Sequence, residues 1–198
     1  MRSRTTSSGP VSARQHSMGG DKPLKTGKHT IWVPAAAMRG TVSNGCAALT
    51  DVETQAGRPD MTVLDFDASA DEHAQFQIAM PDSWDEGTVT FRAYWTVAAA
   101  VTTGVAVFLQ GVAVADDGTI DVAYGTPVVV TDDALNAAED LSVTAESGAV
   151  TIAGSPAAGE LCFFRVGRDI SDGNDDMTQD MRLIGIQLFV TLDQGNDA

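Results

Sequence analysis

The sequence has few of the side chains on which catalysis and metal binding depend. Its 198 residues include two cysteines and three histidines. There is no CxxC motif and no paired Cys/His spacing, so we do not expect a structural zinc site. Two cysteines do not make a disulfide framework. Cys162 lies in the apolar run LCFF and is expected to be a buried thiol, although a single bond to Cys46 stays open as an alternative.

Enzyme motifs are missing as well. None of His16, His29 and His73 lies in a motif such as GxSxG, and there is no glycine-rich phosphate loop. Asp85 and Glu86 are adjacent in a turn, so they cannot face each other across a cleft as glycoside hydrolysis requires. We therefore predict a protein without enzymatic activity and without an organic cofactor. Cleavage of a surface polysaccharide is the least favoured alternative.

Long apolar runs are also absent. The N-terminus lacks the apolar core of a signal peptide, and no run approaches the roughly 18 apolar residues that a membrane span needs. We expect a protein that is made in a cytoplasm, stays soluble and does not enter a membrane.

The charge of the chain is unevenly distributed. Residues 1–28 hold six basic side chains and one acidic side chain, a net charge of +5, whereas the rest of the chain holds six basic and 26 acidic side chains, a net charge of −20. The first 28 residues have almost no large apolar side chains, so they are interpreted as an extended arm that is disordered until a partner fixes it. An expression-tag origin is the alternative. The candidate docking residues of the arm are Arg2, Arg4, Arg14, Lys22, Lys25 and Lys28.

The acidic remainder, residues 29–198, has the pattern of an all-β domain. Apolar and polar residues alternate along most of its runs, and this period of two is typical of half-buried strands. Turn formers recur between the runs, which favours a jelly-roll-like antiparallel β-sandwich. Residues 40–59 are expected to be a connection, and a hairpin is expected around residues 146–148. The expected strands cover residues 29–33, 61–66, 73–80, 88–97, 104–115, 126–131, 141–145, 149–153, 160–166 and 181–192.

Residues 73–96 are expected to form the central hairpin, since two alternating runs flank a link, 81–87, that is rich in turn formers. Trp95 lies on the apolar face of its run and is expected in the core. Trp84 in the link and Tyr94 on the polar face are candidates for stacking on a sugar ring. Packing in the core or in an interface is the alternative use of both.

The run from Val105 to Val114 is apolar on both faces, as in a strand that is covered on both sides by a second sheet or by another subunit. A two-layer sandwich covers one face of each sheet, and a second apolar face would leave an exposed patch. We therefore predict self-association, with Phe108 and Val112 at the interface between subunits.

An acidic loop, residues 168–180, reads RDISDGNDDMTQD. Its carboxylates are hard oxygen ligands at a spacing that could hold Ca²⁺, although the loop does not follow the EF-hand pattern. A solvated loop without a cation is the alternative. The candidate ligands are Asp169, Asp172, Asp175 and Asp176.

The run from Asp65 to Ala198 resembles small virion surface proteins of tailed bacteriophages and gene transfer agents, of the head-decoration, head-spike, head-fibre and tail-fibre types. The matching stretches are DFDASADEHAQFQIAMPDSWDEGTVTFRAYWT, ESGAVTIAG, ELCFFRVGRDISDGND and MRLIGIQLF. The resemblance implies a jelly-roll sandwich that assembles as a homotrimer. It also implies a variable N-terminal part that fits a particular virion.

The leading hypothesis is a non-enzymatic virion structural protein, a capsid decoration (cement) or head-fibre protein. Its basic arm would dock on the major capsid protein or another shell protein, and its acidic sandwich would project from the outer surface. The alternative is a carbohydrate-binding adhesin domain that recognises a glycan of the host surface. Nucleic acid is not expected as a partner, because a body with a charge of −20 repels phosphate.

Overall fold

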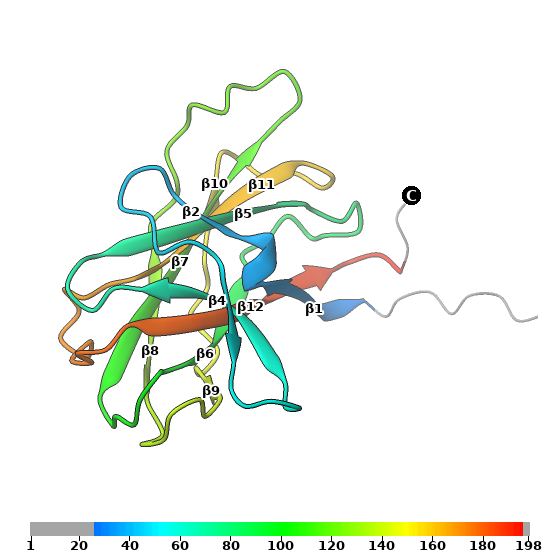
Figure 1. Ribbon diagram of the computed structural model, residues 1–198. Coiled ribbons are helices and arrows are strands. Elements are labelled where there is room, and N and C mark those ends of the chain that lie inside the picture. Colours follow the sequence, from blue (N-terminus) through cyan, green and yellow to red (C-terminus); the bar gives the residue numbers. More distant parts are fainter. Residues whose placement is uncertain (1–25, 196–198) are drawn as a thin grey trace, which may run out of the picture.

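The computed structural model describes residues 26–195, and these form two six-stranded sheets with one short 3₁₀ turn and no α-helix (Figure 1). Sheet A has the order β3-β4-β12-β6-β9, with β1 also pairing with β12, and sheet B has the order β10-β7-β11-β5-β2, with β8 also pairing with β7. The elements are β1 (Gly27–Pro34), η1 (Ala35–Ala37), β2 (Arg39–Gly40), β3 (Thr50–Glu53), β4 (Asp60–Phe66), β5 (Glu72–Ala79), β6 (Thr90–Thr96), β7 (Gly104–Val114), β8 (Val128–Asp133), β9 (Ser142–Val143), β10 (Ile152–Ala153), β11 (Leu161–Arg168) and β12 (Met181–Leu192).

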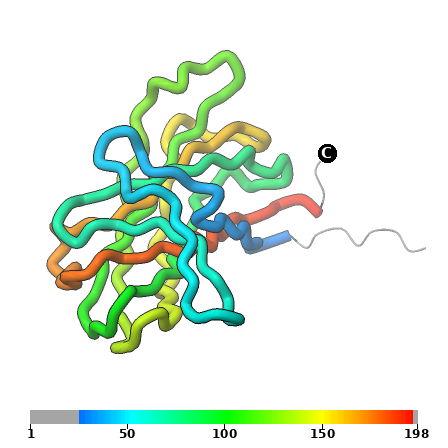
Figure 2. Tube along the Cα trace, viewed as in Figure 1, coloured from blue at the N-terminus to red at the C-terminus, as the bar shows by residue number. Residues whose placement is uncertain are grey.

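The pairing of these strands is antiparallel throughout, apart from the short parallel pair of β10 and β7. The expected all-β, jelly-roll-like sandwich is thereby confirmed. Within the described residues no helix is long and apolar enough to cross a membrane. β1 pairs with β12 along its whole length, from Gly27 opposite Leu192 to Pro34 opposite Gly185, so the two ends of the described chain lie side by side (Figure 2).

The core lies between the two sheets and is built from the inward positions of each alternating run. Phe91 and Trp95 of sheet A and Phe76 and Phe164 of sheet B are buried there, and the rings of the last two stack at 5.2 Å between centroids. The predicted core position of Trp95 is confirmed: its ring is buried and its indole N–H donates to the Asp132 carboxylate at 2.9 Å. Burial of these aromatic side chains is the largest contribution to the stability of such a sandwich.

The central hairpin expected over residues 73–96 is wrong. β5 belongs to sheet B, where it pairs with β11 and β2, and β6 belongs to sheet A, where it pairs with β12 and β9. The link between them crosses from one sheet to the other, because each strand buries its large apolar side chains in the shared core. The hairpin expected around residues 146–148 fails in the same way, since β9 pairs in sheet A and β10 in sheet B.

Of the residues expected to be a connection, 40–59, β3 lies within the stretch and β2 overlaps its first residue. β2 pairs with β5, and β3 pairs with β4 as an antiparallel hairpin at the edge of sheet A. The residues of β3, Thr50–Glu53, are mostly exposed, so the run lacks the apolar alternation that marks the other strands. An edge strand that buries few side chains leaves little pattern to detect.

The prediction that β7 is covered on both faces is confirmed, but its cover comes from the same chain. Phe108 and Val112 point away from the core and are still only 7% and 3% exposed within a single copy. Phe108 packs edge-on against the His73 ring at 5.6 Å and over Gly167, where a Cβ atom would lie 2.6 Å from its ring. These two residues therefore form no exposed patch, and their assignment to a subunit interface is corrected.

Lys28 lies in β1, which begins at Gly27, so it belongs to the sandwich rather than to the arm. Its Nζ contacts the Glu146 carboxylate and lies 4.3 Å above the Phe189 ring. The remaining predicted docking residues, Arg2, Arg4, Arg14, Lys22 and Lys25, lie outside the described residues.

Candidate functional site

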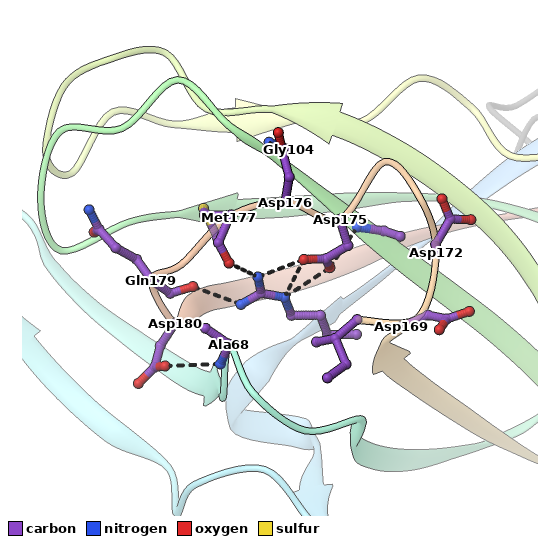
Figure 3. Close-up of polar contacts among 12 residues, drawn as sticks. Ala68, Gly104, Asp169, Asp172, Asp175, Asp176, Met177, Gln179 and Asp180 are labelled. Atoms are coloured by element: carbon purple, nitrogen blue, oxygen red, sulfur yellow. Dashed lines mark hydrogen bonds and ion pairs between the residues drawn. The ribbon is translucent and has the colours of Figure 1, made fainter.

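The acidic loop that follows β11 is organised around a buried arginine. The Arg168 side chain is fully buried and pairs with Asp175, whose oxygens accept from Nε at 2.9 Å and from Nη2 at 2.7 Å. Figure 3 shows the carbonyl oxygens of Met177 and Gln179 converging on the same group, and the Gln179 oxygen accepts from Nη1 at 2.7 Å. The Arg168 guanidinium thus holds the loop against the core.

The four predicted calcium ligands have other partners. Asp175 also accepts from the Ala106 N–H at 3.1 Å, and Asp176 accepts from the Gly104 N–H at 2.7 Å. Asp169 and Asp172 come earlier in the loop and lie apart from Asp175 in Figure 3, and each accepts from a backbone N–H two residues on. Across residues 26–195 no three acidic, histidine or cysteine side chains form a group that could hold a metal ion. The expected ligand set is therefore not brought together.

The histidine and cysteine side chains of the described chain show no activated nucleophile. Cys46 and Cys162 are both free thiols, which settles the open question of their pairing. Burial raises the pKa of Cys46 to about 12 and that of Cys162 to about 11, so neither is a reactive thiolate at neutral pH. Burial, followed by the charge of Arg165, lowers the pKa of His73.

The two predicted glycan contacts have different positions. Trp84 is 2% exposed, so its ring is not available to a sugar. It is buried because the link that carries it crosses the end of the sandwich, where Trp84 forms a bridge with Leu192. Tyr94 lies on the outer face of sheet A and is partly exposed, as the alternation of its run predicted.

An aromatic partner of Tyr94 comes from β1. The Trp32 ring lies edge-on to the Tyr94 ring at 5.0 Å between centroids, and it is 47% exposed. It lies across Gly185 of β12, where a Cβ atom would come within 2.6 Å of Trp32 Cζ2. Glycine at this position therefore lets the indole approach the backbone of the sheet closely.

Polar groups surround this aromatic pair. The Tyr94 hydroxyl donates to the Gln187 side-chain oxygen at 3.2 Å, and Arg92, paired with Gln187 across the strands, lies 5.7 Å from the Phe189 ring. The Nε atom of Arg92 is shielded from solvent and has no hydrogen-bond partner among the described residues. We call the outward side chains of Trp32, Tyr94, Arg92, Gln187 and Phe189 the aromatic platform.

Sequence reasoning missed Trp32, although a signal was present. In the run HTIWV the core-facing residues are Ile31 and Val33, and the alternation then places Trp32 on the opposite face. An exposed tryptophan is unusual enough to mark a surface that has a use, because its large apolar ring is ordinarily buried.

No family model matches this chain, and no curated protein sequence matches it either. Solved structures resemble it weakly. One holds the CBM22-1 and GH10 modules of endo-1,4-β-D-xylanase 10B from Clostridium thermocellum with xylohexaose, at 14% identity and a TM-score of 0.43 over 88% of this chain and 29% of that one. This chain thus spans less than a third of that protein.

Two further structures are single binding domains. The CBM22-2 xylan-binding domain of Xyn10C from Paenibacillus barcinonensis has 10% identity and a TM-score of 0.45, covering 81% of this chain and 99% of that one. The family 11 carbohydrate-binding module of Clostridium thermocellum, in complex with a β-1,3-1,4-mixed-linked tetrasaccharide, has 7% identity and a TM-score of 0.45, covering 83% and 96%. Likeness at this level transfers neither a ligand nor a residue role to this chain.

Proposed function

We propose that this domain is a non-catalytic carbohydrate-binding sandwich and that a sugar ring stacks on Trp32 of the aromatic platform. The observation that carries the proposal is the exposed indole, held against Tyr94 on the outer face of sheet A. The other two tryptophans, Trp84 and Trp95, are buried, so Trp32 is the one exposed indole among the described residues.

The surroundings of Trp32 suit a sugar. The apolar C–H face of a pyranose packs on a flat aromatic ring, while its hydroxyls need donors and acceptors at the edge. Gln187 and Arg92 lie on the strands beside the indole and can supply both. The platform is an open sheet face, so it suits one side of an oligosaccharide or polymer chain better than a small molecule enclosed in a cavity.

The test is a glycan array probed with the wild-type protein, followed by titration of the strongest binder with intrinsic fluorescence as readout. Since Trp32 is the exposed tryptophan of the described chain, bound sugar should change its emission and protect it from acrylamide quenching. Trp32→Ala should weaken binding at least about tenfold, the usual cost of truncating an aromatic anchor.

Ile120→Ala is the matched control. It removes another exposed apolar side chain, 67% exposed, from the loop that follows β7 of sheet B, and it should leave the affinity unchanged. Equal affinity of wild type and Trp32→Ala for every glycan bound, or an array with no bound glycan, would contradict the proposal.

The virion-surface role is a second candidate, supported by the opposite charges of residues 1–28 and the rest of the chain. A basic segment would dock the acidic sandwich on an acidic shell, and that contact would weaken with salt because exposed charge pairs are screened over roughly 8–10 Å. Deleting residues 1–25 should leave the sandwich folded and abolish attachment to particles. Full coating of particles by the truncated protein would remove the arm from this role.

Self-association is tested apart from docking. Light scattering of the isolated full-length protein at micromolar concentration should give the mass of a trimer if the predicted homotrimer forms. A monomeric mass would end that prediction, and it would agree with the burial of Phe108 and Val112 inside one chain.

A further inference from the structure

The outer face of sheet B carries a line of polar side chains that crosses four neighbouring strands. Arg39 of β2 lies opposite Gln75 of β5, Gln75 lies opposite Arg165 of β11, and Arg165 lies opposite Gln110 of β7. Three strand spacings of about 4.8 Å make this line about 14 Å long. We call these four residues the arginine–glutamine row.

Both guanidinium groups of the row are held by neutral oxygens. With each carboxamide oriented by its hydrogen-bond partners, the Gln75 oxygen accepts from Arg39 Nη2 at 2.8 Å and from Nε at 3.1 Å. The Gln110 oxygen accepts from Nε and Nη2 of Arg165, while the Gln110 amide nitrogen donates to the Gly125 carbonyl at 3.0 Å. Each arginine thus uses one edge of its guanidinium on the protein.

Tyr124 fixes the second arginine from the other side. The Arg165 guanidinium lies 5.1 Å from the centroid of the Tyr124 ring. Burial raises the pKa of Tyr124, and the charges of Arg165 and Arg39 both lower it. The two positive charges therefore lie close enough together to act on one group.

The positive charge of the row is not compensated by the protein. Among residues 26–195 the ion pairs are Lys28–Glu146, Arg168–Asp175 and Arg182–Asp65, and neither arginine of the row takes part in one. Residues 29–198 contain 26 carboxylates and six basic residues, yet Arg39 and Arg165 are both held by amides. Their charge therefore remains available to an external anion.

A hollow adjoins the row at its β2 end. It has a volume of about 340 Å³ and is lined by Arg39, Gln75 and Gln77 together with backbone and apolar atoms from Ala36 to Met38 and Phe76. Phe163, which lies opposite Gln77, is partly exposed on the same face. The face thus offers a recess, two cations, one half-exposed ring and two amides, those of Gln75 and Gln77.

We propose that the arginine–glutamine row is a binding site for a carboxylate-bearing saccharide, a chain that contains uronic acid residues. The free guanidinium edges of Arg39 and Arg165 bind carboxylates in a forked geometry. Gln77 and the amide nitrogen of Gln75 pair with hydroxyls, which offer donors and acceptors in alternation. Polyphosphates and nucleic acids fit less well, because a body with a charge of −20 repels a densely charged strand more than a saccharide with one charge per ring.

This site lies on a different sheet from the aromatic platform, so the two proposals stand or fall separately. The probe is a galacturonate trisaccharide, compared with its methyl ester, which has the same shape without the charge. Calorimetric titration at low salt should show binding of the acid and at least about tenfold weaker binding of the ester. Trp32→Ala should leave the affinity for the galacturonate trisaccharide unchanged.

Variants of the row locate the binding. Arg165→Gln and Arg39→Gln should each weaken binding of the trisaccharide at least about tenfold, since a charged hydrogen-bonded pair is lost. Arg58→Gln, which removes an exposed charge from a turn outside the row, is the matched control and should bind as the wild type does. A thermal melt of each variant checks that it is folded. If Arg165→Gln does not fold, Arg39→Gln, at the exposed end of the row, tests the proposal instead.

Three results would overturn the proposal. The wild type fails to bind the galacturonate trisaccharide at millimolar concentration, or it binds the methyl ester equally well, or both row variants bind as tightly as Arg58→Gln. Tighter binding of a short polyphosphate than of the trisaccharide, lost in both row variants, would reassign the site to phosphate.

Discussion

Arg165 and Arg168 lie three residues apart on β11 and have opposite surroundings. Arg168 points into the core, is fully buried, and is paired with Asp175 and two carbonyl oxygens. Arg165 points out of sheet B and is held by a glutamine and a tyrosine ring. An odd separation along a strand places two side chains on opposite faces, so one residue type serves two purposes.

The difference follows from the cost of removing a charge from water. A buried guanidinium is tolerated only when a carboxylate and further acceptors replace its solvation, and removing one member of such a pair leaves the other uncompensated. A guanidinium at the surface keeps its water and needs no anion. The inward Arg168 therefore stabilises the fold, and the outward Arg165 remains available to a ligand.

The largest effect is expected from Arg168→Met. The change leaves Asp175 buried without its cation, which typically costs about 3–5 kcal/mol of the free energy of unfolding. Urea unfolding followed by circular dichroism measures it. The double variant Arg168→Met/Asp175→Leu should recover much of the loss, since no charge is left unpaired, and a single variant as stable as the wild type would show that the pair does not hold the loop.

A smaller effect is expected from Asp175→Asn, because Arg168 keeps the carbonyl oxygens of Met177 and Gln179 as acceptors. The expected loss is about 1–3 kcal/mol, the cost of weakening a buried hydrogen-bonded network. The same unfolding experiment measures it, with Asp172→Asn as a control at a partly exposed position of the loop. A loss as large as that of Arg168→Met would mean that the carbonyls contribute nothing.

Arg165→Gln should change the free energy of unfolding by less than about 1 kcal/mol, since a surface guanidinium is solvated in both states. A loss comparable to that of Arg168→Met would make both arginines structural. The equilibrium unfolding curve in urea decides between these outcomes.

The same variant should raise the pKa of His73. Burial is the first cause of its lowered pKa and the charge of Arg165 is the second, so removing that charge leaves burial opposed by the charge of Asp71. A His73 pKa that is lower in the folded than in the unfolded state means that the unfolded chain binds more protons. Stability then falls as the pH drops below about 6.5, and the fall should be shallower in Arg165→Gln. A proton NMR titration of the imidazole measures the shift, and an unchanged pKa would contradict it.

The smallest effect is expected from calcium. Since Asp175 is bound to Arg168 and Asp176 to a backbone N–H, millimolar Ca²⁺ and chelator should give the same melting temperature. A rise of several degrees with Ca²⁺ would restore the predicted cation site, because a ligand that binds only the folded state stabilises it.

How far the sequence predicts this fold depends on how local each feature is. The alternation of TFRAYWT placed Tyr94 outward and Trp95 inward, and both positions are confirmed. The same rule placed Phe108 and Val112 on the outer side of β7. It could not show that the chain itself covers them, because that cover comes from residues distant in sequence.

Only part of the candidate site was predicted from the sequence. Tyr94 was found from its run, whereas Trp32 was overlooked and Trp84 was assigned to a surface that it does not reach. Trp32 and Tyr94 lie 62 positions apart in the chain and meet only because β1 and β6 both pair with β12. No local pattern encodes such a meeting.

The sequence by itself determined where the long strands lie and which face their side chains take, because the pleat of an extended backbone is a local property with a period of two. The tertiary structure alone decided which strands pair and in which sheet. That choice placed β5 and β6 in different sheets and brought the Asp175 carboxylate to the Arg168 guanidinium. It also aligned Arg39, Gln75, Arg165 and Gln110 into one row. Pairing depends on burying apolar side chains from distant runs in one core, so its free energy belongs to the whole chain and to no single segment.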